Sequence, residues 1–409
     1  MANRVGRKIY RAGASYRKKR AQKIVKFILA IILLAALVFV GYSVAKPIYN
    51  FINEKKDNSS AESPWTPPVM TDAAEQEDST DSEAKTDETS QAETEQSKPK
   101  PSGSFSAYQL PAAALNSPQE LAAALQGVKE SGYTAVSVTL KAEGGKIYYN
   151  TMSEMAVSDE TAVVSNMYAA QISSLIKAEG FTPIAYLNIL EDNNRYGEKR
   201  DGSYHFASDN STWLDNSVAN GGKPWLSPFE TETQSYAAYL ANEISGAGFE
   251  YVILDGLSFP DFRNSDIIHI GGSVGSADRY KALLNIADIA AKAVESNGSE
   301  AMIMLSAGDI LNGKEEVFKP NELTVKNAAV VYAPSEIGGT VMIGGQETAV
   351  AELPAYDKAQ LIFSEITAQA GEDMSIVPVL RKSDFLQADF EASISALVDA
   401  GYQSYVIIG

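Results

Sequence analysis

The sequence contains no cysteine and only two histidines, His205 and His269, among its 409 residues. The absence of cysteine excludes disulfide bonds, thiol nucleophiles and cysteine-based metal sites. Two isolated histidines with no further ligand at metal-binding spacing argue against a zinc centre. The sequence also lacks a phosphate-binding Walker loop, a dinucleotide-binding glycine fingerprint and a Gly-x-Ser-x-Gly nucleophile motif. We therefore expect neither a metal ion nor a cofactor.

Acidic residues are missing from residues 1–26, which hold ten Lys or Arg residues. An uncharged run of nineteen residues, rich in Ile, Leu, Val and Ala, follows at 27–45. At ~1.5 Å per residue, a helix of this length spans the hydrocarbon core of a bilayer. Because the basic flank lies only on the N-terminal side, the positive-inside rule predicts a cytoplasmic tail at 1–26 and a transmembrane anchor at 27–46. The remainder of a single-pass cell-membrane protein would then be extracytoplasmic.

Two other interpretations apply to this N-terminal region. A cleaved signal peptide usually has an apolar stretch of ~7–15 residues and a small-residue cleavage site, whereas this run is longer and Gly41–Ala45 is a weak site. A basic segment can also bind nucleic acid, but beside a membrane span it more simply sets topology and contacts anionic lipid. The net charge is −18 although the tail is basic, so nucleic acid is not an expected partner of the outer part.

Aromatic and branched apolar residues almost vanish between Asn53 and Ser104, where Glu, Asp, Ser, Thr, Gln, Lys and Pro dominate. Such a segment cannot bury enough apolar surface to offset its chain entropy. We therefore expect residues 47–104 to form an acidic, disordered linker that acts as a spacer through the cell envelope. A regulated binding tail is the alternative.

The remaining residues, 105–409, alternate short apolar runs with amphipathic patterns. The apolar runs predict strands at 106–110, 135–140, 182–187, 251–254, 301–305, 328–332, 375–380 and 404–408. The amphipathic patterns predict helices at 118–131, 160–179, 230–247, 277–296, 357–370 and 383–400, with a weak turn near 321–326. Eight such units fit an α/β fold of the (β/α)8 TIM-barrel type better than a doubly wound sheet. In that fold, functional residues lie at the carboxyl ends of the strands.

Asp255 follows the fourth predicted strand directly, which places it at the mouth of the barrel. A carboxylate there is partly desolvated, which costs free energy unless the group takes part in function or forms an ion pair. The alternative is that Asp255 only caps the next loop. Asp309, after the fifth strand, and Glu336, after the sixth, are candidate acidic partners. Glycosidases need two carboxyl groups ~5–5.5 Å or ~6.5–9.5 Å apart, a distance that the sequence does not provide.

Further polar and aromatic residues follow the second and third strands. Lys141 follows the second strand, and Glu191 follows the third, ahead of a long loop that carries Trp213, Asp215 and Trp225. Long loops in compact domains are usually functional or mobile. The tryptophans could stack on a sugar ring, or they could form a satellite hydrophobic cluster that pins the loop.

The order of motifs between 138 and 260 resembles the glycoside-hydrolase domain of bacterial envelope proteins, a TIM barrel distantly similar to the alpha-amylase superfamily. The matching elements are Val138–Lys141, Gly144–Tyr149, Trp213-Leu214-Asp215, Trp225-Leu226-Ser227-Pro228 and Gly248–Pro260. The resemblance implies that Asp255 is the nucleophile or charge stabiliser and that Asp309, or Glu336, is the general acid. It also implies that Lys141, Glu191, Trp213, Asp215 and Trp225 bind sugar.

The sequence departs from this family pattern at three positions. Thr139 stands where the family has Asp, and Gly256 and Ser258 stand where it has Tyr and Arg. Loss of the arginine removes the usual electrostatic partner of a nucleophilic carboxylate. Two functions therefore stay open: hydrolysis of an envelope or extracellular polysaccharide, and non-catalytic binding of a glycan or a partner protein.

Overall fold

The computed structural model describes residues 103–153, 156, 163–193, 202–270, 274, 279–313 and 317–409. The predicted tail, the predicted anchor and the predicted linker as far as residue 102 lie outside this part of the chain. Within the described ranges, no helix combines the length and apolar character that a membrane crossing requires.

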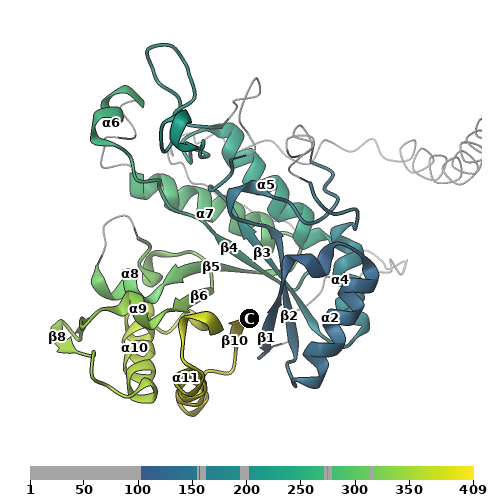
Figure 1. Ribbon diagram of the computed structural model, residues 1–409, viewed down its shortest axis with the longest axis vertical. Helices are drawn as coiled ribbons and strands as arrows, with labels where there is room; N and C mark the ends of the chain where they lie inside the picture. The colour runs from purple at the N-terminus through teal and green to yellow at the C-terminus, as the bar shows by residue number, and fades with distance from the viewer. Residues whose placement is uncertain are drawn as a thin grey trace, which may run out of the picture. The chain divides into compact units, whose positions relative to one another are not determined.

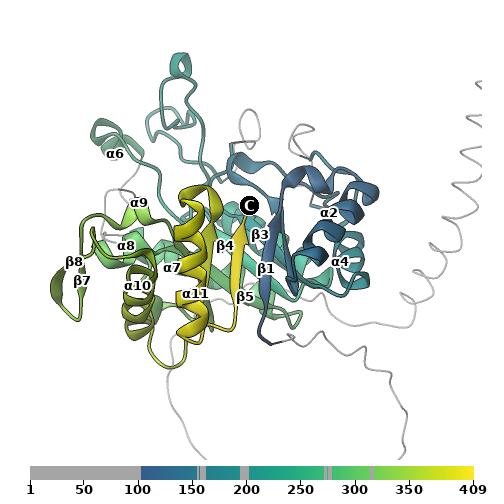
Figure 2. The ribbon, with the colours of Figure 1, turned by 60° about the horizontal axis from the view of Figure 1, so that its bottom comes forward.

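Eight parallel strands close into a barrel in the order β1-β10-β9-β6-β5-β4-β3-β2 (Figure 1). The strands are β1 Ser106–Leu110, β2 Ala135–Lys141, β3 Thr182–Asn188, β4 Tyr251–Asp255, β5 Glu300–Ser306, β6 Asn327–Tyr332, β9 Ser375–Arg381 and β10 Tyr405–Ile408. All eight predicted strands are confirmed. The last strand pairs with the first, Val406 beside Ala107, which closes the barrel (Figure 2).

The strands are apolar because both of their faces are buried. Alternate side chains fill the barrel interior, among them Ala107, Ile184, Ile253, Met302 and Val379. Their neighbours along each strand point outward and join the core beneath the surrounding helices. Burial on both faces explains the continuous apolar runs, which are typical of parallel sheets covered by helices.

The longer helices surround the barrel, and shorter ones lie in the connections (Figure 1). They are α2 Pro118–Glu130, α4 Ala169–Ala178, α5 Thr231–Gly246, α6 Asn264–Ile270, α7 Arg279–Glu295, α8 Ala307–Asn312, α9 Pro334–Ile337, α10 Ala355–Ala370 and α11 Gln387–Asp399. Short 3-10 turns are η1 Ala112–Leu115, η2 Glu143–Gly145, η3 Val218–Asn220, η4 Pro320–Glu322 and η5 Lys382–Asp384. The predicted helix 160–179 is wrong at 163–168, because Val163 pairs there with Ile147 of the loop after β2.

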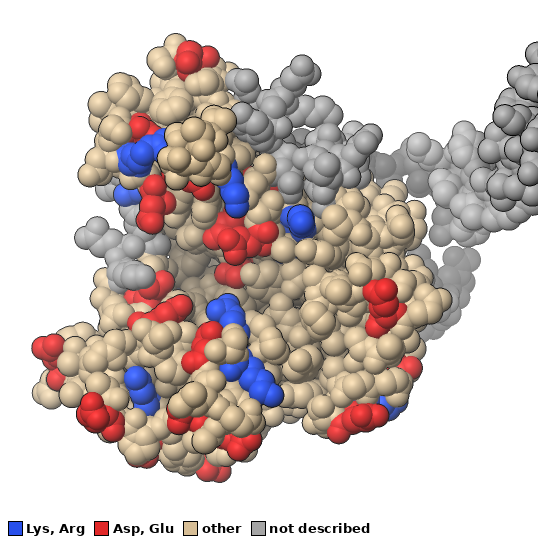
Figure 3. Space-filling model, in the orientation of Figure 1, with Lys and Arg blue, Asp and Glu red and all other residues tan. Residues whose placement is uncertain are grey.

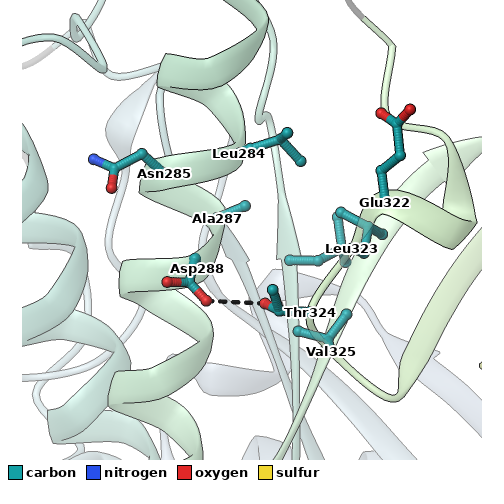
Figure 4. Close-up of a pocket in the computed structure, with 9 residues that line it drawn as sticks. Leu284, Asn285, Ala287, Asp288, Glu322, Leu323, Thr324 and Val325 are labelled. Carbon is teal, nitrogen blue, oxygen red and sulfur yellow. Dashed lines mark hydrogen bonds between the residues drawn. The ribbon is translucent and has the colours of Figure 1, made fainter.

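The connection after β5 is the least regular unit of the barrel. A six-residue helix, α8, and the turn η4 take the place of a full-length helix. A groove of about 260 Å³ is left between α7 and the segment 322–325, crossed by a hydrogen bond from Thr324 to Asp288 (Figure 4). The groove lies on the outer wall of the barrel, and the predicted site residues do not line it.

Three elements had no counterpart in the sequence prediction. These are α6, α9 and an antiparallel hairpin formed by β7, Thr340–Ile343, and β8, Gln346–Ala349. The segment after β3 and helix α6 stand above the carboxyl ends of the barrel strands (Figure 2). They extend the mouth of the barrel, where function is expected in this fold.

Candidate active site

Asp255 is the last residue of β4 and lies beside Asn188, the last residue of β3. The hydroxyl of Tyr186, two residues earlier on β3, donates a hydrogen bond to Asp255 Oδ2. Burial raises the pKa of Tyr186, and the negative charge of Asp255 raises it further. Tyr186 therefore stays protonated and orients the Asp255 carboxylate from inside the barrel.

Glu191 is the acidic residue that the structure brings near Asp255. It lies in the loop directly after β3 and is half-buried. Burial is the main cause that raises the pKa of Glu191, followed by the charges of Glu143 and Asp255. Glu191 therefore holds its proton to higher pH than an ordinary glutamate.

Backbone hydrogen bonds hold Glu143 and Glu191 in neighbouring loops. The amide of Gly144, in η2, donates to the carbonyl of Glu191 at 2.8 Å, and the amide of Asn193 donates to the carbonyl of Gly144 at 3.4 Å. Gly144 has a φ of 79°, a conformation that glycine adopts without strain. In Figure 3, acidic side chains gather in the hollow beside the carboxyl ends of β3 and β4.

Asp309 and Glu336 form a second group, around Ser306 at the end of β5. The Ser306 hydroxyl caps α8 by accepting from the amide of Asp309, and it donates to Glu336 Oε2, both at 3.3 Å. Gly308 allows α8 to approach α9, because a Cβ there would lie 2.7 Å from the carbonyl oxygen of Glu336. Ser306 thus links Asp309 to Glu336, whereas Glu191 feels the charge of Asp255.

Lys141, predicted to bind sugar, lies completely inside the protein. Its ammonium group is 3.1 Å from Asp192 Oδ2, and the two side chains are 0% and 1% exposed. It also donates to the carbonyl of Asn188 at 2.8 Å. Lys141 therefore fastens the loop that carries Glu191 to the end of β2, and its charge is enclosed rather than presented to a ligand.

Trp213 packs in an aromatic cluster of the loop above the barrel. It is 0% exposed, and its ring lies 4.9 Å from that of Phe262 and 6.0 Å from that of Tyr204. Its indole N–H donates to Asp266 Oδ2 at 2.9 Å, and Arg263 lies over its ring. The structure thus favours the pinning cluster over sugar stacking for this tryptophan.

Trp225 and Asp215 contact one another beside this cluster. The Trp225 indole N–H donates to Asp215 Oδ2 at 3.3 Å, and Asp215 Oδ1 accepts from the amide of Lys223 at 2.7 Å. Trp225 is only half-buried, so part of its ring faces outward. Of the two tryptophans, Trp225 is the one with surface available to a sugar.

Tyr186 is a site residue that the sequence prediction missed. The sequence feature that could have identified it is the alternation along β3, which places Ile184, Tyr186 and Asn188 on the inward face. Because successive side chains on a strand point to opposite faces, an inward Asn188 places Tyr186 inward as well. Glu191, predicted only as a binding residue, stands closer to Asp255 than its place in a long loop indicated.

Comparison with known families agrees with this architecture. Residues 107–308 match the model of a family described as "Putative glycosyl hydrolase domain". No curated protein matches the chain. The resemblance to a glycoside-hydrolase domain on a TIM barrel is therefore confirmed, and a glycan-related function is supported.

Several solved structures are similar in fold. The glycoside hydrolase domain of PgaB (BpsB) from Bordetella bronchiseptica is 14% identical, with a TM-score of 0.48, over 74% of this chain and 93% of that one. The catalytic domain of beta-amylase from Paenibacillus polymyxa is 11% identical, with a TM-score of 0.45, over 74% of this chain and 91% of that one. A hypothetical protein from Ruminiclostridium thermocellum is 16% identical, with a TM-score of 0.40, over 47% of this chain and 96% of that one. With TM-scores below 0.5, these likenesses say nothing of substrate or mechanism.

Proposed function

We propose that the protein is a membrane-anchored glycoside hydrolase, and the match of residues 107–308 to the glycosyl hydrolase domain model supports this proposal. Its barrel would act outside the membrane on an envelope or extracellular polysaccharide, and no cofactor or nucleic acid would take part. The uncharged run at 27–45 and its basic flank support the anchor. The acidic group at the ends of β3 and β4 supports the hydrolytic chemistry.

The observation that carries the chemistry is the placement of the half-buried Glu191, which Asn188 holds at the end of β3 beside Asp255 of β4. Burial, followed by the charges of Glu143 and Asp255, raises the pKa of Glu191. Two carboxyl groups in different environments can divide the roles of acid and base. Glu191, protonated, donates its proton to the glycosidic oxygen as the bond to the leaving sugar breaks. As that bond breaks, Asp255, oriented by Tyr186, attacks the sugar carbon, and water then releases the sugar while the Glu191 carboxylate accepts a proton from that water. If Asp255 only stabilises the positive charge, water attacks the sugar carbon directly.

The pH dependence of hydrolysis tests the role of Glu191. A general acid must be protonated, so activity falls as pH rises through its pKa. The pKa of Glu191 is raised, so the alkaline limb of the kcat/KM profile should lie above ~4.3, the ordinary value for glutamate. Glu143→Gln removes a charge that raises this pKa, and the limb should move to lower pH.

A panel of soluble polysaccharides, scored by release of reducing ends, supplies the substrate for this measurement. Glu347→Gln is the matched control, because Glu347 is an exposed carboxylate on the hairpin strand β8. It should leave the alkaline limb in place. A Glu143→Gln profile identical to that of the wild type would contradict the assignment of Glu191 as the acid.

The extracytoplasmic location has its own test. Protease added to intact cells should degrade the barrel domain, while a cytoplasmic marker protein survives. Protection of the barrel until the cells are lysed would contradict this location. The result does not depend on whether the barrel is an enzyme.

Non-catalytic binding is the second candidate, and one position favours it. Ser258, where the family pattern has Arg, is exposed just beyond β4. Among the residues that the structure describes, Asp255 accepts a hydrogen bond from the neutral phenol of Tyr186 rather than from a cation. A barrel that has lost its arginine would keep a polar mouth for a glycan while losing turnover.

A further inference from the structure

Asn188, at the carboxyl end of β3, is a buried amide that forms two hydrogen bonds with Glu191 and also interacts with the hydroxyl of Tyr186. It is 3% exposed. Its Oδ1 accepts from the backbone amide of Glu191 at 3.1 Å, and its Nδ2 donates to Glu191 Oε2 at 3.3 Å. A buried side-chain amide is costly without partners. Asn188 meets this requirement by fixing both the backbone and the carboxyl group of Glu191.

Gly256, directly after Asp255, provides the space in which Asn188 lies. A Cβ at position 256 would lie 2.2 Å from Asn188 Oδ1 and 2.5 Å from its Cγ and Nδ2. Gly256 also has a φ of 65°, which disfavours any other residue. No side chain at position 256 is therefore compatible with this placement of Asn188.

The backbone directly after Asn188 is tied to the end of β4. The amide of Ile189 donates to the carbonyl of Asp255 at 2.8 Å, and the amide of Leu190 donates to the carbonyl of Gly256 at 3.3 Å. These bonds continue the pairing of β3 with β4 beyond the barrel. The loop that carries Glu191 thus has its register fixed against the residue that carries Asp255.

We propose that Asn188 is a positioning residue, which holds the Glu191 carboxyl group beside Asp255 in the space that Gly256 leaves open. This inference rests on the proposed function only where it concerns turnover. A flexible glutamate on a loop would sample several rotamers, and the geometry of an acid decides its rate contribution. Asn188 restricts Glu191 to a rotamer in which its carboxyl group faces the β3–β4 end.

The test is the titration of Glu191 in the full-length protein labelled with carboxyl-¹³C glutamate. The Glu191 signal is identified by its loss in Glu191→Gln. In Asn188→Ala, the midpoint should shift upward, because the bond from Asn188 favours the ionised carboxylate. On the polysaccharide that the wild type cleaves, kcat should fall by about 10–100-fold while KM stays within about threefold.

Asn193→Ala is the matched control, since Asn193 belongs to the same loop but its amide lies against Gly144. Its Glu191 midpoint should equal that of the wild type. Gly256→Ala crowds Asn188 without replacing it, and it should shift the Glu191 midpoint in the same direction as Asn188→Ala. If Asn188→Ala does not fold, Gly256→Ala takes its place in the test. An unchanged midpoint in the variant measured, or an equal shift in Asn193→Ala, overturns the proposal. Wild-type protein that cleaves nothing contradicts the proposed hydrolysis, while the titration still decides the role of Asn188.

Discussion

Replacing Asp255 with Asn should remove hydrolysis while leaving glycan binding almost unchanged. The substitution preserves the size of the side chain and its ability to accept a hydrogen bond from Tyr186. It removes the negative charge that attacks or stabilises the sugar carbon as positive charge develops there. A preorganised charge at a reacting centre is worth on the order of 10³-fold in kcat. Binding that is equal in ground and transition states does not depend on that charge.

Turnover and affinity have to be measured on the same protein to test this expectation. Release of reducing ends gives kcat, and calorimetric titration with the cleaved polysaccharide gives Kd, which should change by less than about threefold. Asp309→Asn tests the other general acid predicted from the sequence: if Glu191 is the acid, its kcat should stay near that of the wild type, because Asp309 lies with Ser306 and Glu336. If Asp255→Asn keeps wild-type turnover, Asp255 is not the catalytic carboxylate. If neither protein cleaves but both bind, the barrel is a binding module.

The barrel could be predicted from the sequence because parallel strands are buried on both faces. Runs such as 251–254 and 328–332 are apolar throughout and are easily separated from amphipathic helices. The connection after β5 was harder, because α8 has only six residues and caps itself through Ser306. Helix 160–179 was predicted too long, since the pairing of Val163 with Ile147 is a tertiary contact. Local periodicity does not report contacts of that kind.

The site could be predicted only in part, for a related reason. The position of Asp255 follows from the rule that barrel strands deliver residues to the mouth. Its neighbour Glu191 depends on hydrogen bonds between separate loops, such as that from Gly144 to the Glu191 carbonyl. Trp213 was ambiguous because a buried and an exposed tryptophan look alike in sequence. The catalytic roles of Asp309 and Glu336 stay predictions, and the contacts at Ser306 show only that these two residues neighbour each other.

Replacing Lys141 with Met should cost about 3–5 kcal/mol of folding stability, because it removes the cation that is paired with a buried carboxylate. Asp192 is 1% exposed and lies 3.1 Å from the Lys141 ammonium group. The substitution also removes the hydrogen bond to the carbonyl of Asn188, at 2.8 Å. The free energy of unfolding, measured by urea denaturation, should fall accordingly. The double variant Lys141→Met with Asp192→Leu should recover much of the loss, since no unpaired charge is then buried.

Lys129→Met is the matched control for this expectation. Lys129 forms an ion pair with Glu179 at 3.2 Å, almost the same separation, but the two side chains are 56% and 32% exposed. An exposed pair contributes only about 0–1 kcal/mol, because water screens both charges. The contrast isolates burial as the cause, since pair type and distance are matched. A loss below about 1 kcal/mol for Lys141→Met would mean that Asp192 takes up a proton or reaches solvent once its partner is gone. The loop with Glu191 would then be held by Asn188 and the backbone bonds to β4 rather than by the ion pair.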